Sequence, residues 1–135
     1  MAGTISIEGH DYVVKPDHRN GAAKKSQWTI PVPAEHDAFR VAMVNGWQAE
    51  DRAWGLHYSN GTVAKLGVRA KDSGDPADLY IAYFLIDKAC HGYPSDPVKR
   101  SHEIPPEAVA QEWLDKSIMR PQAVRKLGRG LPCKP

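Results

Sequence analysis

One stretch constrains the fold of this chain more than any other. Residues 79–86, LYIAYFLI, form its longest apolar run and give way directly to a polar sequence. A run of this kind needs burial on nearly every side, so it predicts a central element against which the rest of the chain packs. Tyr, Ile and Phe in close succession favour a strand. A helix is the alternative, since Asp75 and Pro76 suit a helix start and Gly92 suits a helix end.

The length and composition indicate one ordinary globular domain. The chain has 135 residues, of which 41% are hydrophobic and 25% charged, and we expect a single domain over residues 1–135. No apolar run is long enough to span a membrane, and the first residues lack the basic and apolar blocks of a signal peptide. A cytoplasmic protein without membrane association is therefore expected. In that reducing compartment Cys90 and Cys133 are expected to be free thiols.

The first third of the chain predicts short strands followed by one helix. Residues 1–33 contain two β-type runs that suggest an opening hairpin, a surface loop at 16–26, and a further strand closed by prolines. Residues 34–46 have helical spacing of apolar side chains and end in Asn45-Gly46, a common helix stop.

The remaining sequence predicts a β-meander and then two helices. Residues 54–86 contain two β-rich runs joined by Asn60-Gly61, a strong hairpin signal, and end in the apolar run. Residues 105–128 predict a helix hairpin, because prolines open both helices and glycines follow the second. The expected fold class is α+β: a mostly antiparallel sheet with one inserted helix and a C-terminal helix hairpin packed on one face.

Positive charge is concentrated at the C-terminal end. The net charge is +2, yet residues 116–135 carry six Lys or Arg and no acid, so the other residues sum to −4. This pattern predicts a small non-enzymatic binding module whose basic C-terminal surface engages nucleic acid or a nucleic-acid-associated protein. The alternative is that this basic face of the packed helix pair is simply exposed to solvent and has no partner. The candidate binding residues are Arg120, Gln122, Arg125, Lys126, Arg129 and Tyr93.

Two other functions are compatible with the sequence. A metal-independent endoribonuclease needs a base, an acid and a cation, which His91, His102 and Arg100 could supply, with His57 joining them across the sheet. A protein-binding inhibitor or adaptor would use aromatic residues near Tyr93 as anchors.

No metal site and no cofactor is expected. Cys90, His91, His102 and Cys133 carry suitable zinc-binding atoms, but adjacent residues in a strand point in different directions and no Cys-x-x-Cys pair occurs. Phosphate-binding glycine loops and nucleophile motifs are also absent from the sequence.

Overall fold

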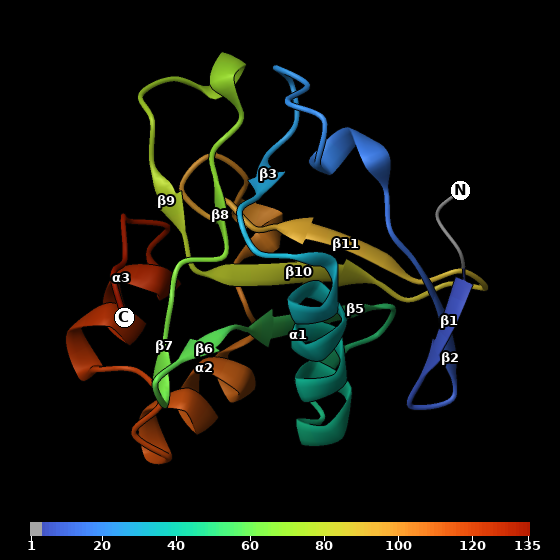
Figure 1. Ribbon diagram of the computed structural model, residues 1–135. Coiled ribbons are helices and arrows are strands. Elements are labelled where there is room, and N and C mark those ends of the chain that lie inside the picture. Colours follow the sequence, from blue (N-terminus) through green and yellow to red (C-terminus); the bar gives the residue numbers. More distant parts are fainter. Residues whose placement is uncertain (1–3) are drawn as a thin grey trace.

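The computed structural model describes residues 4–135 and confirms the α+β class (Figure 1). The apolar run is a strand, which makes the helical alternative wrong: most of it forms β10 (Ile81–Leu85), preceded by β9 (Asp78–Leu79). Strand β10 lies inside a four-stranded antiparallel sheet with the order β11-β10-β5-β4. Its neighbours are β11 (His91–Pro94), β5 (Arg52–Leu56) and β4 (Gln48–Ala49).

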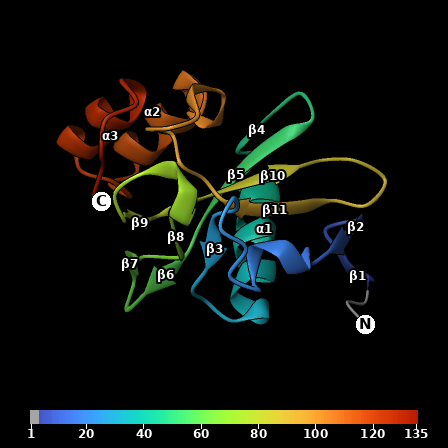
Figure 2. The same ribbon diagram turned by 90° about the horizontal axis from the view of Figure 1, so that it is seen from above.

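Helices cover both faces of this sheet (Figure 2). Because side chains alternate along a strand, Ala82 and Phe84 of β10 pack on the side of helix α1 (Val32–Asn45). Ile81 and Tyr83 pack on the opposite side, with residues of α2 (Glu107–Asp115) and α3 (Pro121–Gly128). The inserted helix and the packed C-terminal helix pair are therefore confirmed.

Helix α1 approaches the sheet closely because Gly55 lies beneath it. A Cβ atom at Gly55 would lie 2.3 Å from the backbone oxygen of Ala38, so only glycine fits there. The helix begins before the predicted residue 34, since Pro33 can occupy its first turn. It ends as predicted at Gly46, whose φ of 69° gives the left-handed cap.

The predicted meander over residues 54–86 needs correction in its strand order. Strand β5 pairs directly with β10, and no strand of residues 62–69 lies between them. After β5 the chain forms a small hairpin, β6 (Tyr58–Ser59) and β7 (Thr62–Val63), around the predicted turn, where Asn60 and Gly61 have positive φ. The chain then crosses to a second, three-stranded sheet of order β3-β8-β9, in which β3 is Gln27–Trp28 and β8 is Gly67–Val68.

The N-terminal hairpin consists of β1 (Thr4–Ile7) and β2 (His10–Val13) and confirms the predicted one. It docks beside the main sheet. The Cys90 backbone N–H donates to the Asp11 carbonyl at 2.8 Å, and the Val13 N–H donates to the Cys90 carbonyl at 2.8 Å. None of the helices in residues 4–135 is long and apolar enough to cross a membrane.

Candidate functional site

The basic face of α3 follows from how that helix packs. Ala123 and Leu127 are buried in the core shared with α2 and the sheet, so the residues on the opposite side of the helix face solvent. Together with Leu131, four exposed polar residues line one shallow depression of about 350 Å³. These four, called the α3 face below, are Gln122, Arg125, Lys126 and Arg129.

The cations of the α3 face have no counter-charge in the part of the chain that the structure describes. Within residues 4–135, no carboxylate lies within ion-pair distance of Arg125, Lys126 or Arg129. Of the basic residues after position 115, Lys116 alone forms such a pair with a described residue, Glu112, at 3.6 Å. The α3 face is therefore an uncompensated positive surface.

Two residues predicted to join this surface lie elsewhere. Arg120 donates from Nη2 to the Lys134 carbonyl at 3.0 Å, and it lines a different hollow with Lys116 and Tyr58. Tyr93 lies on β11 and does not line the depression of the α3 face.

Tyr93 belongs instead to a buried polar cluster. Its hydroxyl donates to Glu103 Oε2 at 2.8 Å, while Glu103 Oε1 accepts the Asp96 backbone N–H at 2.7 Å. The Glu103 side chain is 0% exposed. Burial first, and then the adjacent Glu103 carboxylate, raises the pKa of Tyr93, which keeps its hydroxyl protonated as the donor. Glu103 thereby fixes both the ring of Tyr93 and the loop that follows β11.

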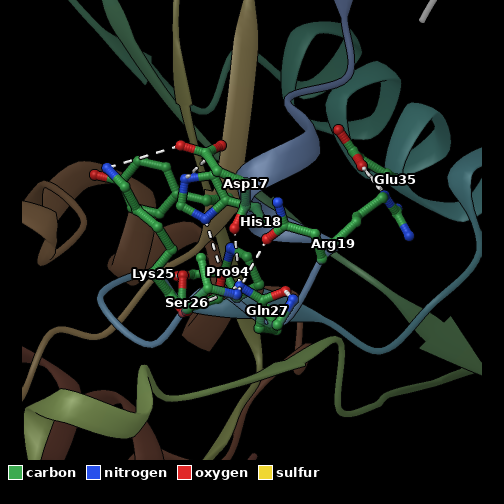
Figure 3. A network of polar contacts seen from close by, with 12 residues as sticks. Asp17, His18, Arg19, Lys25, Ser26, Gln27, Glu35 and Pro94 are labelled. Atoms are coloured by element: carbon green, nitrogen blue, oxygen red, sulfur yellow. Dashed lines mark hydrogen bonds and ion pairs between the residues drawn. The ribbon is translucent and has the colours of Figure 1, made fainter. Parts of the chain in front are cut away.

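The ring of His18 stacks on the ring of Tyr93, with 4.7 Å between the ring centroids and an interplanar angle of 11°. His18 Nδ1 lies 2.8 Å from the Ser26 carbonyl. Figure 3 draws this contact as a dashed line. A carbonyl can only accept, so Nδ1 carries the proton and Nε2 keeps its lone pair when the ring is neutral. Burial lowers the pKa of His18.

The segment that carries His18 was predicted as a surface loop, but it is tied down at several points. It begins with a 3₁₀ helix, Pro16–His18. Arg19 donates from Nε and Nη2 to Glu35 Oε1 at 3.0 and 2.7 Å and from Nη1 to the Ile30 carbonyl at 2.8 Å (Figure 3). The Ser26 hydroxyl donates to the Pro94 carbonyl at 2.8 Å and so joins the segment to β11.

A polar hollow of about 100 Å³ opens beside this stacked pair, and we call it the His18 hollow. Its walls include His18, Ser26, Ser73 and Tyr93. Three cations also line it, Lys24 and Lys25 from the tied-down segment and Arg100 from the loop after β11.

The residues proposed for a ribonuclease are only partly brought together. His91 shares a face of β11 with Tyr93. The ring of His102 lies 6.0 Å from that of Tyr83, at an exposed position. His57 lines none of the hollows next to these residues, and its carbonyl accepts the Ala64 N–H instead. Sequence reasoning missed His18, because nothing in its loop signals that it reaches a strand far along the chain.

The candidate zinc residues do not assemble. In the part of the chain that the structure describes, no group of three or more His, Cys, Asp and Glu is placed to hold a metal ion. Cys90 is buried and Cys133 is half-buried, and both are free thiols.

Compared with known proteins, the chain matches no family model, no curated protein and no solved structure.

Proposed function

We propose that this protein is a small non-enzymatic binding module that engages nucleic acid through the α3 face. The observation that carries the proposal is that Arg125, Lys126 and Arg129 share one exposed depression and that none of them is paired with a carboxylate of residues 4–135. Binding to phosphate groups would supply the missing counter-charge and release condensed cations from the nucleic acid.

The chemistry of the α3 face fits phosphate contacts. Arginine presents a planar fork of N–H donors that can bind phosphate oxygens in pairs, lysine adds a point charge, and the Gln122 amide adds neutral donors. Contacts of this kind position a protein on a nucleic acid backbone without reading its sequence.

Arg125 and Lys126 have a structural role as well. Both lie in the last turn of α3, where positive side chains stabilise the partial negative charge of the helix end. Other arginines of the chain show how an arginine with a purely structural role is bound in this protein. Arg19 and Arg69 are each bound to a buried carboxylate, Glu35 and Asp96, whereas the cations of the α3 face are not.

We place the module in the cytoplasm, whose reducing conditions would keep Cys90 and Cys133 as thiols.

Fluorescence anisotropy with labelled single-stranded RNA and duplex DNA tests the proposal. We expect affinity to fall between about 50 and 200 mM salt, and Arg125→Ala with Lys126→Ala to weaken binding and reduce the slope of log affinity against log salt by about 2. The matched control is Lys15→Ala with Lys88→Ala, which removes the same charge from exposed positions away from the α3 face. Absence of binding in low salt, or an equal loss in both double variants, would remove the nucleic acid as the partner. A single acidic protein that binds at one-to-one stoichiometry would then support the adaptor alternative.

A further inference from the structure

We propose that the His18 hollow is a second, separate site that binds a phosphate group. The hollow combines cations from two distant segments, Lys24 and Lys25 on one side and Arg100 on the other, around a buried histidine. No residue of the α3 face lines it. The inference therefore stands whether or not the α3 face binds nucleic acid.

The negative charges at the hollow are already neutralised or engaged. Asp96 accepts from Arg69 Nε at 2.7 Å and from Arg69 Nη2 at 3.2 Å. Glu103 accepts from the Tyr93 hydroxyl and from the Asp96 backbone N–H, and its side chain is fully buried. Asp96 is thus neutralised by Arg69, whereas both oxygens of Glu103 accept hydrogen bonds and His102 Nε2 lies 3.6 Å from its Oε2.

The polar groups that remain unengaged are mainly donors. Across residues 4–135, Lys24 and Arg100 form no ion pair and no side-chain hydrogen bond, and Lys25 only approaches Asp17 at 3.9 Å. The Ser73 hydroxyl adds another donor. His18 is 8% exposed, and its Nε2 lies 4.0 Å from Asp17 Oδ1. This nitrogen can accept from the hydroxyl of a protonated phosphate. A set of free donors with one such acceptor suits a phosphate better than a carbonyl compound or a cation.

The hollow is small and held in place before any ligand arrives. Its volume of about 100 Å³ equals that of roughly three water molecules, which accommodates one phosphate group but not a whole nucleotide. The Asp72 backbone N–H donates to the Ala23 carbonyl at 2.9 Å, and Ser26 is bonded to Pro94. Because the three contributing segments are already joined, binding costs little ordering of the chain.

Two sources can supply this phosphate: a small phosphate ester, or the backbone of a nucleic acid strand. The probes are inorganic phosphate, a mononucleotide and a short RNA, each titrated into the labelled protein while NMR signals of His18, Ser73 and Arg100 are followed. We expect saturable shifts of these signals with inorganic phosphate. A mononucleotide that shifts them more strongly than RNA identifies a small ester as the source, and RNA that competes with inorganic phosphate identifies the backbone.

Substitution of the cations separates this site from the α3 face. Arg100→Gln and Lys24→Gln should each weaken phosphate binding by about tenfold or more, the usual effect of losing a charge-assisted hydrogen bond. Lys88→Gln removes the same charge elsewhere and should change little, and Arg125→Ala with Lys126→Ala should leave the phosphate-dependent shifts intact.

The site is refuted if inorganic phosphate gives no saturable shift at His18 and Arg100, or if Lys88→Gln weakens binding as much as Arg100→Gln does. Both tested cations are exposed, so the fold does not depend on them.

Discussion

At the scale of single residues, the structure depends on buried acids that the sequence does not reveal. Glu35 lies in the first turn of α1, and its side chain is 0% exposed. It is held by Arg19 from a distant loop and by the hydroxyl of Tyr12 from β2. A buried charge is tolerated only when it is paired and hydrogen-bonded, so this contact joins three separate parts of the chain.

Replacing Arg19 with alanine is expected to lower the free energy of unfolding by roughly 3–5 kcal/mol, because Glu35 would be left as an unpaired buried charge. Urea denaturation followed by Trp fluorescence measures this change. The control is Arg40→Ala, which breaks an exposed pair with Asp37 and should cost less than about 1 kcal/mol. Equal losses in the two variants would show that the buried pair contributes no more than the exposed one.

His18 is expected to make stability depend on pH. Burial lowers its pKa in the folded protein below the ordinary value of 6.5, so the unfolded chain binds the proton more tightly. Its contribution is therefore complete above pH 6.5 and is lost as the pH falls through 6.5 towards the lower folded pKa. Denaturation at several pH values between about 7 and 5 should show a smaller decline for His18→Gln than for the parent chain. Parallel declines would assign the pH effect to other groups.

At the scale of elements, close packing of α1 against β5 depends on one glycine. Gly55→Ala places a Cβ atom 2.3 Å from the Ala38 carbonyl oxygen, and the helix would have to move away. We expect a loss of about 1–3 kcal/mol or more, measured by thermal or urea unfolding. Gly128→Ala is the control, since a Cβ there meets no atom within 4 Å. At this last residue of α3 it should be neutral or stabilise by up to about 1 kcal/mol. If Gly55→Ala did not lower the free energy of unfolding, α1 would be able to move away from β5 without cost.

The elements that could be predicted from sequence are those with a strong local signal. The apolar run, the turn at Asn60-Gly61 and the two C-terminal helices, each opened by prolines, all carry such signals. Strand β4 was missed because it has 2 residues, Gln48–Ala49, and strand β11 was missed because His91–Pro94 mixes polar residues with glycine and proline. Their strand conformation comes from pairing with β5 and β10, which local patterns do not encode.

At the scale of the whole molecule, the four-stranded sheet lies between two hydrophobic cores, one on each face. The side facing α2 and α3 buries Trp54, Ile81 and Trp113. A chain that ends at residue 104 would expose this apolar surface to water. We expect it to bind the dye ANS and to lose a cooperative thermal transition. Removal of residues 134–135 alone should leave the transition in place. A sharp transition at the original temperature in the shorter chain would show that the other core is sufficient.

The candidate site was predictable only where its residues are neighbours in sequence. Gln122, Arg125, Lys126 and Arg129 come together because helical spacing places them on one side of α3. Tyr93 and Arg120 were assigned to the same surface on charge and composition alone. Tyr93 lies on β11, and Arg120, although it precedes α3 directly, faces a different hollow. The His18 hollow could not be predicted, because it is formed where three loops meet, and which loops meet depends on the order of strands in the sheet.

The docking of the N-terminal hairpin beside Cys90 has a consequence for how copies of this chain behave in concentrated solution. An outermost strand with unpaired backbone groups recruits strands from other molecules and starts aggregation. Here β11 lies at one margin of the main sheet, and both of its ends are bonded: Cys90, directly before it, pairs with Asp11 and Val13, and the Pro94 carbonyl accepts from Ser26. The opposite margin, β4, is very short. These contacts hinder fibril-like stacking of strands from different molecules, and loss of the first hairpin would remove that protection.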